Sequence, residues 1–518
     1  MTVQTAPAPS IAEAGPAQVL PDDVHNRALV ANVHPADWVN PTPPAGRYNL
    51  VVIGAGTAGL VSAMGAAGLG AKVALIERHL LGGDCLNFGC VPSKALLRVA
   101  HAVHDVRSAG AFGVDVAGPV EADFGAAMER LRRLRAGISG NDSAQRAKDA
   151  GVDVYLGQAR FTGPDTVEVG GQTLRFRKAV IATGARAATL PVPGLAEAGY
   201  LTNETVFSLT ALPARLAVIG AGPIGCELAQ AFRRLGGEVM VFNREQQVLP
   251  REDVDAAAII GAAFVAEGVG LTLGANLVRV EREGAAKVVV FERGRGEERW
   301  VADEILVAIG RAPNTEGLGL DAAGVAYDAH GVTVDDRLKT TNRRIYAAGD
   351  ICSRYKFTHA ADAMARIVLQ NALFFGRKKA SALFIPWATF TDPEIAHVGL
   401  YEAEAQAQAR DLRTYTVELA DVDRAILDGE TDGFARLHVD AKSGRILGAT
   451  LVARHAGDMI GEVVLAMTEK LKVDALARAI APYPSQGEVW KKLGDAHART
   501  RLTPGLARGF KRWFKLWR

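Results

Sequence analysis

Two cysteines separated by four residues are the most reactive feature of the sequence. Cys85 and Cys90 lie in the string GGDCLNFGCVPSK. A loop this short gains little stability from a disulfide, so we expect the pair to do chemistry by storing two electrons as a disulfide or a dithiol. The competing interpretation is two buried, inert thiols.

The residues after the second cysteine favour its ionisation. The segment KALLRVAHAVH has the pattern of a helix, and Cys90 would open it. The positive N-terminal end of a helix stabilises a thiolate. Lys94 would then lie one turn later on the same face. Cys226 and Cys352 have no cysteine nearby, and we expect both to be packing residues.

A glycine-rich turn stands ahead of the cysteines. Gly54, Gly56 and Gly59 lie between the apolar run NLVVI and the small-residue segment LVSAMGAAGLG, a pattern of strand, turn and helix. Such a turn lets backbone N–H groups and a helix N-terminus approach a pyrophosphate. Glu77 ends the next expected strand, 18 residues after Gly59. Its carboxylate could accept hydrogen bonds from a ribose, so we predict a dinucleotide site.

A second copy of the motif lacks the acid. Gly220, Gly222 and Gly225 repeat the pattern, but Asn243 stands 18 residues after Gly225 and is followed by Arg244. A carboxylate there would repel a 2′-phosphate, whereas an amide beside a guanidinium accommodates one. We therefore predict NADPH as coenzyme, with NADH as the weaker candidate. The alternative is that Arg244 is only a solvated surface charge.

Length and composition set the class of protein. The 518 residues suffice for about three domains. With 59 Lys and Arg against 57 Asp and Glu, the chain has no footprint of a dedicated nucleic-acid binder. Four cysteines exclude a secreted disulfide framework, and neither a membrane span nor a signal peptide is evident. We expect a cytoplasmic enzyme, and we predict no resident metal.

The motifs also divide the chain. We predict an α/β fold with two Rossmann-like dinucleotide-binding domains in series, followed by a C-terminal α+β domain. The expected segments are an extended N-terminal arm (1–46), a first dinucleotide-binding domain (47–205 and 338–380), a second (206–337), the α+β domain (381–497) and a basic aromatic tail (498–518).

These motifs and their order resemble the FAD-dependent pyridine nucleotide-disulfide oxidoreductases, the family of glutathione reductase, dihydrolipoamide dehydrogenase and mercuric reductase. The resemblance covers roughly residues 47–497. It implies that the α+β domain is a dimerisation domain. The protein would then be a homodimer whose substrate sites are made from both chains.

The resemblance also implies which residues hold FAD. FAD would lie along the first glycine turn and Glu77, with Lys94 near the flavin. Asp350, in the string RRIYAAGDI, matches the family's second FAD motif. The ATG stretch that ends the first dinucleotide unit adds Thr183 and Gly184. Gly310, in the AIG stretch that ends the second unit, is a candidate for binding the pyridine nucleotide.

The same resemblance assigns the redox roles. Cys85 would be the interchange thiol that faces substrate, and Cys90 the thiol in charge-transfer contact with the flavin. Glu227, in the string GAGPIGCE, matches the acid that pairs with the lysine at Lys94. Hydride would pass from NADPH to FAD, and an electron pair from FAD to the disulfide.

The string APYPSQGE departs from the glutathione and lipoamide enzymes. Those enzymes carry a histidine and, five residues later, a glutamate; here Glu488 is present but Tyr483 replaces the histidine. A phenol with a reference pKa of about 10 is a poor proton shuttle at neutral pH. Mercuric reductases also carry a tyrosine at this point, and reduction of a thiolate-bound soft metal ion does not need the same acid.

Two further departures concern access to the site. Mercuric reductases deliver the metal through a cysteine pair near the C-terminus, whereas this chain has no cysteine after Cys352. Pro223 stands where glutathione reductase has a tyrosine that gates the nicotinamide pocket. A more open pocket would favour quinones or oxygen as acceptors.

The tail is basic and aromatic. Residues 499–518 contain seven Arg or Lys and no acid. Phe510, Trp513, Phe514 and Trp517 follow the i, i+3, i+4, i+7 spacing of one helix face. Such a helix could lie on an anionic membrane surface. The alternatives are that it docks on the protein itself or frays in solvent.

We therefore predict a flavoprotein oxidoreductase similar to mercuric reductase. It would pass electrons through Cys85 and Cys90 to a soft-metal, disulfide or quinone acceptor, a small-molecule or metal-thiolate substrate, in the cytoplasm or at a membrane surface. One alternative is an enzyme similar to dihydrolipoamide dehydrogenase. Another is a redox sensor or membrane-associated protein in which Cys85 and Cys90 switch oxidation state without turnover.

Overall fold

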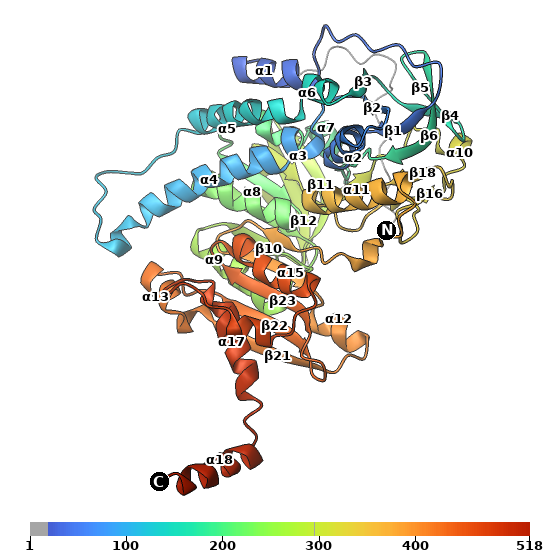
Figure 1. Ribbon diagram of the computed structural model, residues 1–518. Coiled ribbons are helices and arrows are strands. Elements are labelled where there is room, and N and C mark those ends of the chain that lie inside the picture. Colours follow the sequence, from blue (N-terminus) through green and yellow to red (C-terminus); the bar gives the residue numbers. More distant parts are fainter. Residues whose placement is uncertain (1–18, 295) are drawn as a thin grey trace. The chain divides into compact units, whose positions relative to one another are not determined.

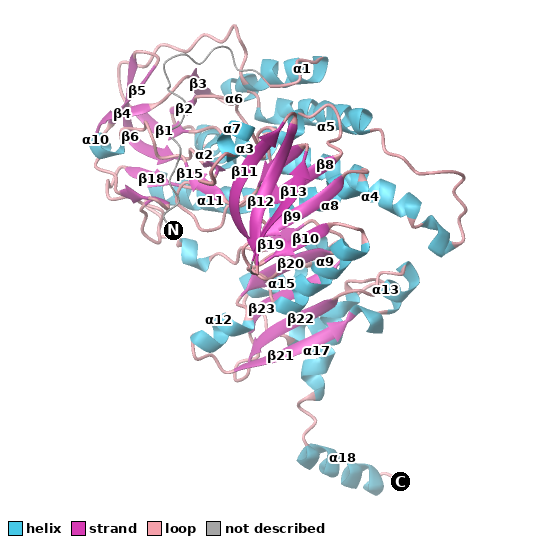
Figure 2. Cartoon of the chain, turned by 180° about the vertical axis from the view of Figure 1, so that it is seen from behind, coloured by secondary structure: helices cyan, strands magenta, loops and turns pink. Residues whose placement is uncertain are grey.

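The computed structural model describes residues 19–294 and 296–518. By their internal contacts the residues form two compact units. The first comprises the residues up to Val248 together with Phe264–Leu383, and the second comprises Leu249–Ala263 and Phe384–Arg518. Each unit has its own sheets, which Figures 1 and 2 show from opposite sides.

The first unit opens with a largely parallel sheet in the order β3-β2-β1-β6, which β18 joins in parallel and β5 and β4 extend in antiparallel. Alternate residues of β1 enter two cores: Leu50 and Val52 face one, and Val51 and Ile53 the other. A strand buried on both faces explains the uninterrupted apolar run in the sequence. The strands are β1 (Tyr48–Ile53), β2 (Val73–Glu77), β3 (Val152–Leu156), β4 (Arg160–Gly163), β5 (Thr166–Val169), β6 (Gln172–Ile181) and β18 (Ile345–Ala347).

Helices cover this sheet. α2 and α11 pack against each other, and small residues such as Ala63 and Ala365 let the two helices approach closely over one core. The helices of this part are α2 (Thr57–Gly68), α3 (Gly83–Asn87), α4 (Cys90–Arg107), α5 (Phe124–Ser139), α6 (Ala144–Asp149) and α11 (Thr358–Leu373).

A second parallel sheet, in the order β10-β9-β8-β14, repeats the plan. Pro223 occupies the first turn of α8, where its missing N–H costs no helical hydrogen bond. The elements are β8 (Arg215–Ile219), α8 (Pro223–Arg234), β9 (Glu238–Asn243), β10 (Gly270–Leu273), the antiparallel meander β11 (Asn276–Glu283), β12 (Ala286–Arg293) and β13 (Gly296–Ala302), and β14 (Glu304–Val307). The helix α9 (Val254–Ala266) lies between β9 and β10 in the sequence, but most of its residues belong to the second unit. Both Rossmann-like halves that the glycine motifs predict are therefore present.

Short elements connect the two sheets of the first unit. β7 pairs with β15 in antiparallel, and β16 pairs with β17. Their bounds, with two one-turn helices, are β7 (Ala185–Ala187), α7 (Leu195–Ala198), β15 (Arg311–Pro313), α10 (Leu320–Ala323), β16 (Tyr327–Asp328) and β17 (Gly331–Val332).

The second unit is built on an antiparallel sheet in the order β19-β20-β23-β22-β21. Alternate residues of β22, namely Ala435, Leu437 and Val439, enter its core together with Trp490. This arrangement confirms the predicted α+β fold. The elements are β19 (Trp387–Thr389), β20 (Glu394–Gly399), α12 (Glu402–Ala407), β21 (Leu412–Glu418), α13 (Asp423–Asp428), β22 (Phe434–Asp440), β23 (Ile446–Ala453), α14 (Ala456–Met459), α15 (Gly461–Thr468), α16 (Asp474–Arg478), α17 (Glu488–Arg499) and α18 (Pro504–Leu516). No helix in the described part of the chain is long and apolar enough to cross a membrane.

Residues 19–46 differ from the extended arm that the sequence predicts. They contain the helix α1 (Val24–Val33), which Asp23 caps by accepting a hydrogen bond from the Asn26 N–H at 2.7 Å. Leu29 and Val33 are fully buried in the first core. The prolines that suggested an extended arm flank this helix and do not interrupt it. Residues 1–18 of the expected arm lie outside the described part.

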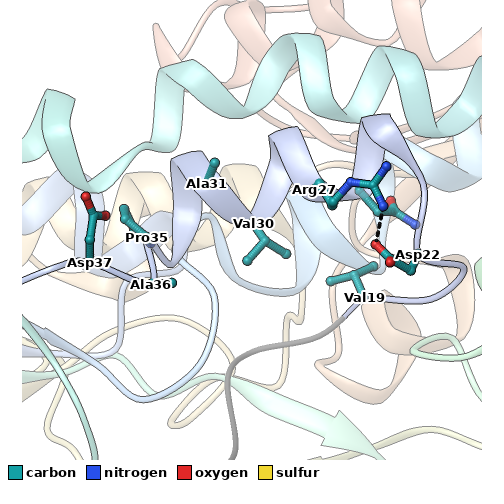
Figure 3. Close-up of a pocket in the computed structure, with 9 residues that line it drawn as sticks. Val19, Asp22, Arg27, Val30, Ala31, Pro35, Ala36 and Asp37 are labelled. Atoms are coloured by element: carbon teal, nitrogen blue, oxygen red, sulfur yellow. Dashed lines mark hydrogen bonds and ion pairs between the residues drawn. The ribbon is translucent and has the colours of Figure 1, made fainter.

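A pocket borders α1. Val19, Arg27, Val30 and Ala36 are among its lining residues, and Figure 3 shows Arg27 paired with Asp22 at one end. The distance between Arg27 Nη1 and Asp22 Oδ1 is 2.9 Å. None of the predicted site residues lines this pocket. The candidate active site lies instead at the cysteines and the glycine turns.

Candidate active site

The two cysteines lie at the junction of two helices. Cys85 belongs to α3, and Cys90 is the first residue of α4, as the sequence predicts. Gly82 and Gly83 have φ angles of 84° and 60°, a left-handed conformation that favours glycine and turns the chain into α3. Both cysteines are thiols, Cys85 half-buried and Cys90 exposed.

The surroundings separate the acidities of the two thiols. A hydrogen bond from Cys85 lowers the pKa of Cys90 to about 6, and the Thr358 hydroxyl and the Lys94 charge act in the same direction. The same hydrogen bond and burial raise the pKa of Cys85. Cys90 is therefore the thiolate at neutral pH, and Cys85 stays protonated.

Thr358 was not among the predicted site residues. It is the first residue of α11, and its Oγ1 lies 3.5 Å from Cys90 Sγ although the two residues are 268 positions apart. No local motif links the two segments, so only the fold reveals this hydrogen-bond partner.

Lys94 follows Cys90 by one helical turn and forms an ion pair with Glu227 of α8. Lys94 Nζ lies 2.7 Å from Glu227 Oε2, and only 6% of the Glu227 side chain is exposed. Burial of a carboxylate without a cationic partner costs free energy, so the Glu227 side chain needs the Lys94 ammonium group. The ion pair thereby holds that ammonium group beside α4. The structure thus brings together the two residues that the family resemblance pairs.

In the first motif, steric constraints require glycine at two positions. Gly54 has a φ of 96°, and a Cβ there would lie 2.4 Å from the Ala182 oxygen. A Cβ on Gly59 would lie 1.8 Å from the Gly54 oxygen. These approaches let β1 turn directly into α2, for which Gly56 is an N-cap without a side-chain hydrogen bond. The first N–H groups of α2 are therefore left for an anionic ligand such as a pyrophosphate.

Glu77 ends β2 beside this turn. Its Oε2 accepts the Ala55 N–H at 2.7 Å, and its Oε1 accepts the His79 N–H at 2.8 Å. The side chain is buried, and burial raises its pKa. A pocket lined by Gly54, Glu77 and Thr183, among others, opens here. This position suits a ribose next to the phosphate-binding turn.

Thr183, from the predicted ATG stretch, and Asn314 also line that pocket. Thr183 Oγ1 donates to the Asn314 oxygen at 2.9 Å, and Asn314 Nδ2 donates to the Thr183 oxygen at the same distance. Gly184 has a φ of 67°. Asp350 follows β18; burial raises its pKa, and Lys356 Nζ donates to its backbone oxygen at 2.8 Å. Sequence reasoning missed Asn314.

A buried arginine supports the segment between the cysteines. Arg135 of α5 is 1% exposed; its Nη1 donates to the Asn87 oxygen at 2.6 Å, and its Nη2 donates to Asn26 Oδ1 at 2.7 Å. Burial lowers the pKa of Arg135 to about 10, so it remains charged at neutral pH. Because Asn87 closes α3, Arg135 ties the cysteine segment to α1.

A second arginine contacts the residue before Cys85. Arg311 Nη2 lies 3.0 Å from Asp84 Oδ1 and 2.6 Å from the Ala185 oxygen. Asp84 also accepts a hydrogen bond from Asn203 at 2.8 Å. Sequence reasoning missed Arg135 and Arg311, because their partners are remote in the sequence.

The second glycine motif repeats the geometry of the first. Gly220 has a φ of 104°, and a Cβ there would lie 2.6 Å from the Ala308 oxygen. A Cβ on Gly225 would lie 2.0 Å from the Gly220 oxygen. Gly222 is the N-cap of α8, and Gly310, with a φ of 129°, follows β14. The N-terminus of α8 is thus a second candidate pyrophosphate site.

Asn243 and Arg244 lie at the end of β9. Asn243 Nδ2 donates to the Gln247 oxygen at 2.9 Å. The Arg244 side chain is 74% exposed, and its Nη2 lies 3.5 Å from Glu245 Oε1. An exposed ion pair of this length contributes little, so the guanidinium could turn to a phosphate.

Tyr483 and Glu488 belong to the second unit. Tyr483 is exposed, and its hydroxyl donates to Asp423 Oδ2 at 2.8 Å. The hydrogen bond to Asp423 and that carboxylate's charge raise the pKa of Tyr483. Glu488 opens α17 five residues later. A phenol held in this way stays protonated at neutral pH and is a weak acid.

Family models match most of the chain. Residues 48–365 match the pyridine nucleotide-disulphide oxidoreductase model, and residues 385–493 match the dimerisation domain of the same family. A mercuric reductase of Bacillus cereus is 37% identical over 85% of this chain and 70% of its own length. A dihydrolipoyl dehydrogenase of Chlamydia muridarum is 34% identical over 86% of this chain and 95% of its own.

Solved structures have the same fold. The HOCl-induced flavoprotein disulfide reductase RclA from Escherichia coli superposes with a TM-score of 0.77 at 30% identity, covering 86% of this chain and 99% of its own. LpdA from Mycobacterium tuberculosis gives a TM-score of 0.79 at 28% identity over 86% and 99%.

Proposed function

The chain belongs to the pyridine nucleotide-disulphide oxidoreductase family, and from this premise we propose that it passes electrons from NADPH to a thiolate-bound soft metal ion such as Hg(II) through Cys85 and Cys90. The family uses FAD and NAD(P)H, and the dimerisation domain supports a homodimer. The observation that carries the proposal is the arrangement of the pair: Cys90 is the first residue of α4 with Thr358 Oγ1 3.5 Å from its Sγ, and Cys85 is a second free thiol in the preceding helix α3. The opposite pKa shifts of the two thiols agree with this arrangement.

The residues present fit FAD. A side chain at Gly54 or Gly59 would strike the backbone, Glu77 lies beside the turn, and the cysteine helix carries Lys94. Gly56 and Glu77 would hold the pyrophosphate and ribose, and Lys94 would lie near the flavin. When bound, FAD supplies a carrier that takes up hydride and gives an electron pair to a disulfide.

The cysteine pair suits a linear, two-coordinate metal ion. Hg(II) that arrives with two small thiolates can exchange both for Cys85 and Cys90. Two bonds from mercury to the small thiolates break, two bonds to the cysteines form, and the Cys85 proton leaves with a departing thiolate. Reduction of Hg(II) to Hg(0) takes two electrons, the number that one NADPH delivers.

Tyr483 favours a metal over an ordinary disulfide. Reduction of a small disulfide releases a thiolate that an acid should protonate. A phenol whose pKa Asp423 raises is a poor donor for this step. Metal exchange needs no such acid, because the leaving thiolate can take the Cys85 proton. We propose that Tyr483 and Glu488 of one subunit face the cysteine pair of the other.

The coenzyme is part of the proposal. The exposed Arg244 beside the amide of Asn243 would receive the 2′-phosphate of NADPH. We propose that the metal reaches Cys85 directly from small thiols in the cytoplasm.

The test is the rate of NADPH oxidation with Hg(II) in excess small thiol, corrected for the oxidase rate. We expect stimulation in the wild type and in Cys352→Ala, which removes a half-buried thiol, and its loss in Cys85→Ala. Cu(II) belongs in the same assay, since a Cu(II) complex of the E. coli relative is known. Stimulation by small disulfides and by neither metal would favour a dihydrolipoamide dehydrogenase-like enzyme. If Cys85 and Cys90 change oxidation state but the protein does not catalyse multiple turnovers, the result would indicate a redox sensor.

A further inference from the structure

The C-terminal helix α18 has two faces of opposite character. At about 100° of rotation per residue, each group below spans only about 120° of the circumference. One face carries Leu506, Phe510, Trp513 and Phe514, continued by Trp517 just after the helix, and the opposite face carries Arg508, Lys511, Arg512 and Lys515, continued by Arg518. The predicted aromatic stripe is therefore one face of an amphipathic helix.

The helix is defined by its own sequence. Thr503 caps it by accepting the Leu506 N–H at 3.3 Å, and Pro504 occupies its first turn. No residue of α18 is buried; Trp513 is 54% exposed and Phe514 62%. Among the described residues of its own unit, the stripe is therefore not docked, in contrast to the alternative in which it packs on the protein itself. An isolated helix of 13 residues is marginal in water, so a partner surface is needed to hold it.

We propose that α18 binds an anionic phospholipid surface. The apolar face would lie at the level of the headgroups and upper acyl chains, a depth that tryptophan favours. The five cations on the other face would be attracted by the lipid phosphates. Because residues 499–518 contain no acid, nothing in the segment neutralises this charge. The inference concerns where the enzyme binds and goes beyond its redox function.

Other binding partners would not account for both faces of α18. Single-stranded nucleic acid is bound by aromatic side chains interleaved with cations along one groove, whereas here aromatic and basic residues point to opposite sides. A second copy of α18 could cover the apolar face but would leave the cations without a partner. An anionic bilayer accounts for both faces at once.

The experiment is flotation of the full-length flavoenzyme with vesicles of phosphatidylcholine containing about one third phosphatidylglycerol, against vesicles of phosphatidylcholine alone. Flavin absorbance and NADPH oxidation in each fraction report that the enzyme is folded. A matched variant exchanges neighbours, Arg512→Trp with Trp513→Arg and Phe514→Lys with Lys515→Phe. It keeps the composition and charge of the tail but mixes the two faces.

We expect the wild type to float with anionic vesicles, with an apparent affinity at least about tenfold above that of the exchanged variant and of a chain ending at Thr503. Raising the salt from about 0.1 M to about 0.5 M should release it in part. Equal flotation of all three proteins would overturn the proposal. So would tail-dependent binding to duplex or single-stranded DNA without vesicle binding, or a tail-dependent rise in oligomer mass. Loss of metal reduction with vesicle binding intact would count against the proposed function alone.

Discussion

The Lys94 ammonium lies 2.7 Å from the Glu227 carboxylate, one helical turn after Cys90. The lysine stabilises the Cys90 thiolate, whereas the carboxylate offsets the field of the lysine. Removal of the Lys94 charge and removal of the Glu227 charge should therefore shift the pKa of Cys90 in opposite directions.

Lys94→Met should raise the pKa of Cys90, and Glu227→Gln should lower it, each by about one pH unit or about 1.4 kcal/mol. The thiolate fraction rises as pH passes upward through the pKa, so Lys94→Met moves the midpoint of alkylation to higher pH. The rate of iodoacetamide labelling of the reduced enzyme against pH measures this. Shifts of the same sign in both variants would contradict the pairing.

Gly59→Ala should abolish FAD retention, because the new Cβ would lie 1.8 Å from the Gly54 oxygen and force the turn open. Gly68→Ala is the matched control in the same helix, since a Cβ there meets nothing within 4 Å. FAD retention is measured as the flavin absorbance of the two purified variants. Full flavin content in Gly59→Ala would mean that this turn does not hold FAD.

Arg135→Met should lower the free energy of unfolding by about 1–3 kcal/mol, because it leaves the Asn87 oxygen and the Asn26 amide without their donor. Arg133→Met, at an exposed site on the same helix, should cost much less. Denaturant unfolding followed by flavin fluorescence compares them. A cost for Arg135→Met no larger than that of its control would remove the support assigned to this arginine.

Arg244→Ala should raise the KM for NADPH about tenfold or more and leave that for NADH nearly unchanged, because only NADPH carries the 2′-phosphate. Arg282→Ala, an exposed arginine on β11, serves as the control for lost surface charge. Initial rates with both coenzymes provide the comparison. A wild-type enzyme that prefers NADH would refute the coenzyme assignment.

Local motifs gave most of the fold. Each glycine turn lies between a strand and a helix that are adjacent in sequence, so spacing alone placed Gly54, Gly220 and the start of α4 at Cys90. Local sequence also determines α18, because its cap and its two faces are formed by residues 503–518.

Contacts between distant segments could not be inferred in this way. Thr358 reaches Cys90 across 268 residues, and Arg135 reaches Asn26 across 109. The helix α1 was missed because the surrounding prolines suggest an extended chain, while burial of Leu29 in the first core stabilises it. The pairing of Lys94 with Glu227 came from family resemblance, since no local pattern links α4 to α8.

The most direct test of the redox mechanism is anaerobic titration with NADPH, in which the long-wavelength absorbance of a thiolate next to the flavin is followed against pH. We expect the band to appear on two-electron reduction and to rise with pH through a midpoint of about 6, the pKa of Cys90. Cys90→Ser should abolish the band, and Cys85→Ser should retain it. Absence of the band in the wild type, or its survival in Cys90→Ser, would contradict the role of Cys90 as the thiolate next to the flavin.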